Sequence, residues 1–212
     1  MIRPEWPAPD NVLAGTTLVD TRDDALPSGL ALLNQVHGSR VVTIDEVRAA
    51  AGPTDADAVT GHETGDVCAV RTADCLPVLF CARDGSVIAA AHAGWRGLAA
   101  GVLENTVLAM ARAGPELMAW IGPAISQPNF EVGDEVREAF VAHDPAAARC
   151  FAANARGRWQ ADLYALARQR LGAVGVARVY GGDWCTFGDA ERFHSYRRDP
   201  GCGRMVSFVA LK

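Results

Sequence analysis

The chain has 212 residues, of which half are apolar and 21% are charged, and its formal net charge is -5. This is the composition of an ordinary globular protein, and the negative charge gives no reason to expect nucleic acid or an anionic membrane surface as a partner. No apolar run reaches the ~18 residues of a membrane-spanning helix, and the N-terminus lacks the basic and apolar regions of a secretory signal. We therefore expect one cytoplasmic domain over residues 1–212, with no linker to divide it, and we favour a monomer.

The chain order predicts short strands with helices interspersed. From the apolar runs and the turn residues between them, strands are expected at 12–19, 30–33, 41–44, 67–72, 78–82, 87–91, 118–122, 176–180 and 204–211. Helices are expected at 45–51, 98–113, 133–142 and 163–171. Because the strands come in hairpin-like groups without strict strand–helix alternation, we expect an α+β fold with mixed β-sheets and not a doubly wound parallel fold.

A hairpin in the middle of the chain brings two reactive side chains together. Asp84-Gly85 between two apolar runs predicts a tight turn that pairs residues 78–82 with residues 87–91. Cys75, just outside the first strand, and His92, at the end of the second, then lie near the same edge of the sheet. A thiol and an imidazole in this position can bind a metal or form a nucleophile and base pair. Pro77 removes an amide donor and favours a bend or an edge position.

Two further segments carry residues suited to a site. His37 sits in a tight loop between two strands, next to Gly38. After His92, the loop 93–97 opens a helix, and its free backbone amides together with Arg96 could bind a phosphate or a carboxylate. None of the six cysteines forms a Cys-x-x-Cys pair, so zinc-ribbon and thioredoxin-like sites are not indicated, and we expect most of them to be buried thiols.

Seven motifs, in order and from about residue 30 to the C-terminus, resemble the YfiH-like family, also called the laccase-domain or multicopper polyphenol oxidoreductase family. They are residues 34–38 (Asn-Gln-Val-His-Gly), 72–78 (Thr-Ala-Asp-Cys-Leu-Pro-Val), 91–97 (Ala-His-Ala-Gly-Trp-Arg-Gly), 121–125 (Ile-Gly-Pro-Ala-Ile), 130–133 (Phe-Glu-Val-Gly), 185–186 (Cys-Thr) and 193–199 (Phe-His-Ser-Tyr-Arg-Arg-Asp). The resemblance implies a β-sandwich of mixed sheets flanked by helices, and a metal, usually zinc, held by His37, Cys75 and His92.

The resemblance also implies a purine nucleoside activity: phosphorolysis of adenosine, inosine, guanosine or methylthioadenosine, and deamination of adenosine. Older naming in the family implies copper-dependent oxidation of phenols, and some members are associated with editing of peptidoglycan precursors. Family members often carry cysteines just before the Phe-Glu-Val motif, where this chain has Gln127-Pro128-Asn129. This difference argues against additional thiolate-bound copper and leaves the two-histidine, one-cysteine site unchanged.

Two imidazoles and one thiolate suit zinc or copper, and three protein ligands leave a fourth position for water or substrate. Phosphorolysis also needs a site for phosphate, for which Arg71, Arg96 and the amides near Gly94 and Gly97 are the candidates. We expect the metal site and the anion site to share one pocket, with a nucleoside and phosphate as the small-molecule partners. Cys75, His37 and His92 are then both the metal ligands and the catalytic residues.

Other functions remain open from the residues alone. The chain could be a copper-dependent polyphenol oxidase, or a metal-free cysteine hydrolase with Cys75 as nucleophile and His92 or His37 as base. It could also be a non-catalytic partner in peptidoglycan precursor editing, for which the sequence offers no positive feature. His37 and Cys75, each taken alone, fit a packed core as well as a metal site.

Several residues near these motifs have two interpretations each. Asp74 either orients a metal ligand or caps the backbone turn, and His194 could simply tie down its loop. Arg197 and Arg198 either pair with structural acids or reach the pocket. Trp95 and Phe187 could stack on a purine, although packing is the usual role of an aromatic ring.

Overall fold

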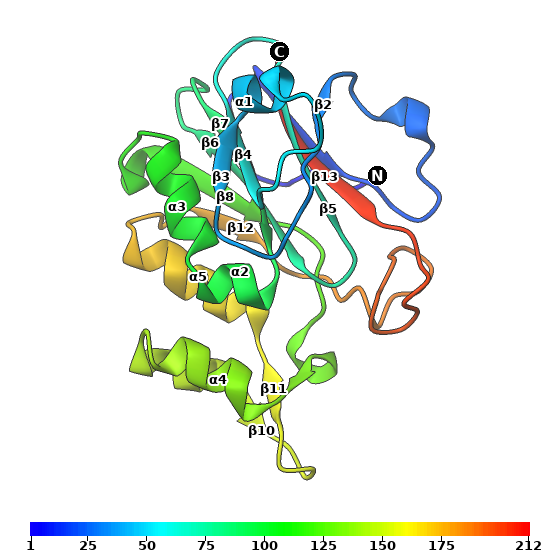
Figure 1. The fold of residues 1–212 in the computed structure, drawn as a ribbon, viewed down its shortest axis with the longest axis vertical. Helices are drawn as coiled ribbons and strands as arrows, with labels where there is room; N and C mark the ends of the chain where they lie inside the picture. The colour runs from blue at the N-terminus through cyan, green and yellow to red at the C-terminus, as the bar shows by residue number, and fades with distance from the viewer.

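The computed structural model describes residues 1–22 and 24–212, and its main body consists of two β-sheets and a layer of helices (Figure 1). The larger sheet has six strands in the order β12-β8-β6-β7-β4-β3, and the smaller has four in the order β1-β13-β5-β2. The six-stranded sheet contains β3 (Val41–Thr43), β4 (Ala58–Gly61), β6 (Leu76–Ala82), β7 (Ile88–Ala93), β8 (Leu117–Ile121) and β12 (Val179–Gly181). The four-stranded sheet contains β1 (Val12–Thr16), β2 (Leu30–Ala31), β5 (Val67–Thr72) and β13 (Met205–Leu211).

The two sheets pack face to face around a buried apolar layer. The six-stranded sheet contributes Leu79, Ile88 and Trp120 to this layer, and the four-stranded sheet contributes Val70 and Val209. The opposite face of the six-stranded sheet is covered by helices α3 (Val102–Ala109) and α5 (Leu163–Ala173) (Figure 1). The arrangement is an α+β sandwich of mixed sheets flanked by helices, which confirms the predicted fold class.

Cover on both faces explains the sequence of the central hairpin. Every residue of β6 and β7 is buried, so these strands read as continuous apolar runs and not as alternating ones. The hairpin turns at Asp84-Gly85 as predicted, and Gly85 has a φ of 71°. Pro77 lies inside β6, in the middle of the sheet, so the expected edge position is wrong. It is tolerated because its missing amide faces the end of β8, where the Pro77 carbonyl accepts a hydrogen bond from the Gly122 amide.

The predicted helix 98–113 is two helices. Helix α2 (Trp95–Ala99) begins directly after Gly94, and α3 begins after Gly101, whose φ of 90° lies in the left-handed region and interrupts the helical path. Leu108, in the second of these helices, is 79% exposed and points away from the core. The remaining predicted helices correspond to α1 (Ile44–Ala49), α4 (Asp134–Val141) and α5, the last capped by the Asp162 side chain.

A third, small sheet lies beside α4 at one end of the molecule (Figure 1). Its strands are β9 (Glu131–Val132), β10 (Phe151–Ala153) and β11 (Trp159–Ala161), in the order β10-β11-β9. These strands of two or three residues were not predicted, because a period of two cannot be recognised over so short a run. No helix among the described residues is long and apolar enough to cross a membrane.

Candidate metal and anion site

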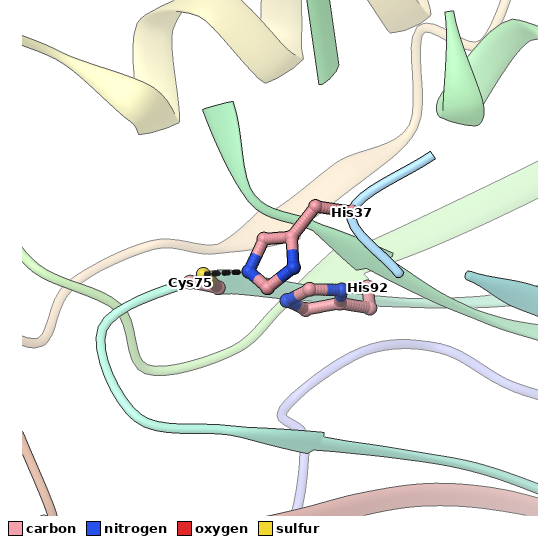
Figure 2. Close-up of side chains that lie close together, drawn as sticks. All are labelled: His37, Cys75 and His92. Atoms are coloured by element: carbon pink, nitrogen blue, oxygen red, sulfur yellow. Dashed lines mark hydrogen bonds between the residues drawn. The ribbon is translucent and has the colours of Figure 1, made fainter. Parts of the chain in front are cut away.

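His37, Cys75 and His92 meet at one point, as the sequence predicts (Figure 2). Their ligand atoms all lie within 4.8 Å of one another, and the Cys75 Sγ is 3.9 Å from the His37 Nε2. The two imidazole rings are 4.8 Å apart between centroids and nearly perpendicular. Ligand atoms around a tetrahedral zinc lie about 3.5 Å apart for bonds of 2.0–2.3 Å, so a small contraction brings this set to metal-binding distance.

The hairpin positions two of the three ligands. Register pairs Pro77 of β6 with His92 of β7, so Cys75 and His92 emerge at the same end of the two strands. The third ligand arrives on the loop between β2 and β3, where His37 has a φ of 60°. A non-glycine residue in the left-handed region is uncommon, and such strain gathers where a side chain must be held in a functional position.

Asp57 is the residue that holds this constellation, and sequence reasoning missed it. Its side chain is fully buried, and its Oδ1 accepts a hydrogen bond of 2.8 Å from His92 Nδ1 and one of 2.9 Å from the His37 amide. Its Oδ2 accepts a bond of 2.7 Å from the Gly38 amide. The carboxylate therefore fixes the His37 loop and turns the His92 Nε2 toward the site, as carboxylates do behind metal-ligating histidines.

The site stabilises charge on Cys75 and His92. Burial raises the pKa of the Cys75 thiol, but the hydrogen bonds and charges of His37 and His92 outweigh burial and lower that pKa to about 6. Burial lowers the pKa of His92, but Asp57 and Cys75 outweigh it and raise the pKa to about 9. The thiolate is the form of cysteine that ligates a metal and also the form that acts as a nucleophile. The Cys75 thiolate is therefore available for either role at neutral pH, whereas His92 must release a proton before its nitrogen can bind a metal.

Close packing around the triad explains the Gly-Trp-Arg-Gly loop. A Cβ on Gly94 would lie 3.0 Å from the Cys75 Sγ and 3.1 Å from the His37 Cδ2. A Cβ on Gly97 would lie 2.6 Å from the backbone oxygen of Gly38. A side chain at position 97 would therefore clash with the backbone, and one at position 94 would crowd the ligands, so both glycines serve close approach and not an unusual φ.

Asp74, next to Cys75, connects three loops at the site. Its Oδ1 accepts a hydrogen bond of 2.6 Å from the Thr186 hydroxyl, and its Oδ2 accepts bonds of 3.0 Å from the Ser195 hydroxyl and 2.7 Å from the Arg197 amide. Its φ is 84°. Asp74 therefore neither touches a metal ligand with its carboxylate nor caps its own turn, and instead ties the C-terminal loop to the Cys75 segment.

The triad opens into a cavity of about 870 Å³ whose lining is strongly basic. The predicted anion-binding residues Arg71 and Arg96 both line it, and so do Arg197 and Arg204. Among the residues that the structure describes, none of these four arginines forms an ion pair with a carboxylate. Both oxygens of Asp74, which also lines the cavity, already accept hydrogen bonds.

The other singled-out residues divide between structure and cavity. The Arg198 guanidinium donates to the backbone oxygens of Thr186, Phe187 and Phe193, so it holds its loop, as expected of a structural arginine. Trp95 lines the cavity, whereas Phe187 packs against the core. His194 lies outside the cavity lining, and burial together with the charges of Arg198 and Arg204 lowers its pKa. The cavity also contains Tyr196 and Arg204, which the sequence did not single out.

Comparison with known proteins finds relatives over most of the chain. A family model described as multi-copper polyphenol oxidoreductase laccase matches residues 8–212. Purine nucleoside phosphorylase YfiH of Escherichia coli K12 is 53% identical over 186 residues, which are 88% of this chain and 75% of the relative. Purine nucleoside phosphorylase PA4543 of Pseudomonas aeruginosa is 54% identical over 181 residues, 85% of this chain and 73% of the relative.

Solved structures show the same fold. The crystal structure of Neisseria meningitidis protein NMB0706 superimposes with a TM-score of 0.90 at 43% sequence identity, over 100% of this chain and 98% of that chain. The structure of YlmD from Geobacillus stearothermophilus has a TM-score of 0.86 at 24% identity, over 96% of this chain and 93% of that chain. With a family model matched over nearly its whole length and relatives more than half identical, the chain belongs to the laccase-like YfiH family of multi-copper polyphenol oxidoreductases.

Proposed function

We propose that this protein is a zinc-dependent purine nucleoside phosphorylase that cleaves adenosine, inosine, guanosine or methylthioadenosine and also deaminates adenosine. The observation that carries the proposal is one cavity with two kinds of group: a two-histidine, one-cysteine triad, and four arginines without carboxylate partners among the described residues. The names of the relatives support the same activity.

The residues present fit zinc. Imidazole nitrogens and a thiolate are its preferred ligands, three protein ligands leave one position open, and Asp57 holds His92 as a supporting carboxylate does in zinc sites. Zinc bound there would act as a Lewis acid toward a water or a substrate atom, which is the chemistry that deamination needs. We place the activity in the cytoplasm, where reducing conditions keep the Cys75 thiol free to bind the metal.

The arginines serve the phosphorolysis half of the proposal. In that reaction an oxygen of phosphate forms a bond to C1′ of the ribose while the bond from C1′ to the purine nitrogen breaks, and the purine leaves with the electron pair and takes up a proton. Arg71 and Arg96 bind and orient the phosphate, because guanidinium groups donate paired hydrogen bonds to its oxygens. Their positive charge also offsets the charge of the phosphate as it approaches the ribose.

The description of the family favours copper-dependent oxidation of phenols as a second candidate. The donor set of the triad suits copper as well as zinc. A multicopper oxidase, however, needs several metal positions, and the described residues contain one cluster of three metal-ligating side chains. Metal analysis of the purified protein together with oxygen uptake in the presence of a phenol distinguishes the two candidates.

The test of the proposal is product analysis with metal-replete protein. Inosine should release hypoxanthine and ribose 1-phosphate only when phosphate is supplied, and adenosine should also yield inosine. Cys75→Ser should lose zinc and both activities together, whereas Cys185→Ser, a half-buried thiol outside the cavity lining, should keep them. Absence of these products from the zinc-loaded protein would refute the proposal. Activity that survives chelation and disappears on thiol alkylation would instead identify a cysteine hydrolase.

A further inference from the structure

Two of the cavity arginines lie at one end of the β5–β13 pair, because Arg71 is in β5 and Arg204 comes just before β13. The antiparallel register of β5 and β13 pairs Arg71 with Val206 and Thr72 with Met205. Arg204 directly precedes β13, and successive side chains of a strand alternate between faces, so Arg204 is on the same face as Val206 and is the diagonal neighbour of Arg71. Diagonal neighbours of this kind are within reach of long side chains.

Both arginines are held in place by neutral groups. The Gln35 side chain donates a hydrogen bond of 2.8 Å to the Arg71 carbonyl and accepts one of 2.8 Å from the Arg71 amide, so it clamps the backbone of this residue. The Arg204 guanidinium donates to the carbonyls of Cys202 and Gly203 and lies over the ring of Tyr196, 5.7 Å from its centroid. These contacts use only part of the donors that a guanidinium offers.

Two like charges side by side are unfavourable unless something compensates them. A carboxylate partner provides such compensation for Arg48, Arg156 and Arg192. Arg71 and Arg204 have none among the described residues, are both exposed, and both line the cavity that holds the triad. A ligand anion between them would supply the missing charge and engage their free donors.

We infer that Arg71 and Arg204 together form a phosphoryl-binding subsite in which each guanidinium donates to one side of a single phosphate group. The inference deepens the proposed function, on which it rests for the identity of the anion, and it assigns Arg204 a binding role. The phosphate group could be the inorganic phosphate that attacks the ribose, or the 5′-phosphate of a nucleotide substrate. Both have the same tetrahedral dianionic chemistry.

The test measures binding directly, by isothermal titration calorimetry on the zinc-replete protein, with inorganic phosphate, adenosine and adenosine 5′-monophosphate as titrants. Arg71→Gln and Arg204→Gln should each weaken phosphoryl binding at least tenfold and change adenosine affinity less than twofold. Arg204→Lys keeps the positive charge but loses the paired donors of the guanidinium group, so its affinity for phosphoryl groups should lie between those of Arg204→Gln and the wild type. Arg112→Gln is the control, because this exposed arginine contacts Ser86 at the opposite end of the β6–β7 hairpin. Circular dichroism verifies that each variant is folded.

The same titrations distinguish the two possible sources of the phosphate group, inorganic phosphate and a nucleotide. If the subsite takes inorganic phosphate, the nucleotide binds no more tightly than adenosine. If it takes a 5′-phosphate, the nucleotide binds at least tenfold more tightly than adenosine, and Arg204→Gln removes that advantage.

The inference is overturned if inorganic phosphate and adenosine 5′-monophosphate bind Arg204→Gln as tightly as the wild type, if only Arg71→Gln has an effect, or if the wild type binds neither of these two phosphoryl compounds. A wild-type protein that binds phosphate through this pair but releases no purine base would retain the subsite and refute the phosphorolysis.

Discussion

The most informative perturbation of the triad is Asp57→Asn, which removes the charge behind His92 and leaves the three ligands unchanged. Each carboxylate oxygen accepts hydrogen bonds: Oδ1 from His92 Nδ1 and the His37 amide, and Oδ2 from the Gly38 amide. An asparagine retains one acceptor oxygen and turns an NH₂ group toward the other donors, so at least one buried donor faces another donor.

The magnitude follows from the burial of Asp57 and the charge of its partner. Removing one member of a buried, hydrogen-bonded ion pair destabilises a protein by about 3–5 kcal/mol, and loss of the carboxylate behind a metal-ligating histidine weakens metal binding by about 10–100-fold. Both figures apply to Asp57→Asn, because the Asp57 side chain is completely buried and its partner His92 is only 3% exposed. We expect both the stability of the metal-free protein and its zinc affinity to fall.

Urea unfolding of the metal-free protein measures the first quantity, and competition with a chromophoric chelator measures the second. Asp55→Asn is the matched control, because this aspartate lies two residues away, is exposed, and accepts a bond from the Asn34 side chain. It should change stability by no more than about 0.5 kcal/mol and leave zinc affinity unchanged. Zinc affinity and stability that remain at wild-type values in Asp57→Asn would refute the assignment of Asp57 as the residue that holds the site.

Three other predictions concern the immediate surroundings of the triad. Gly94→Ala, whose Cβ would crowd the Cys75 Sγ at 3.0 Å, should lower zinc content measured by elemental analysis, whereas Gly52→Ala, which meets nothing within 4 Å, should not; full zinc content in Gly94→Ala would show that the site adapts. In metal-free protein, the Cys75 pKa of about 6 predicts that the rate of alkylation of this thiol increases with pH through a midpoint near pH 6. Peptide mass spectrometry measures this rate, and a midpoint above pH 8 would contradict the prediction. Asp74→Asn should loosen the loop tied to it and raise hydrogen exchange across residues 186–197, with exchange at the wild-type rate as the contrary result.

Local signals account for the parts of the site that the sequence predicts well. The Asp84-Gly85 turn lies between two apolar runs, and a two-stranded hairpin follows from these few residues alone. Cys75 and His92 are therefore brought together by a contact that needs no knowledge of the remaining chain.

Long-range contacts account for what the sequence does not reveal. His37 reaches the site because Asp57, twenty residues later, captures the amides of its loop. The one sequence signal for the role of Asp57 is its position directly before β4, a strand whose residues are all buried. A carboxylate there needs a partner, because an unpaired buried charge is unfavourable. Arg204 joins Arg71 only through the register of β13 on β5, and no local pattern fixes the pairing of strands so far apart in the chain.

Two buried acids explain how a protein of net charge -5 presents a basic cavity. Asp57 contacts His92 and Asp74 adjoins Cys75, and both oxygens of each carboxylate accept hydrogen bonds from amides, hydroxyls or the His92 imidazole. Their charge therefore holds the loops of the site together, and neither carboxylate forms an ion pair with a cavity arginine among the described residues. The same interactions that fix the triad leave Arg71 and Arg204 to attract an anion, so the metal ligands and the phosphoryl subsite depend on one arrangement of loops.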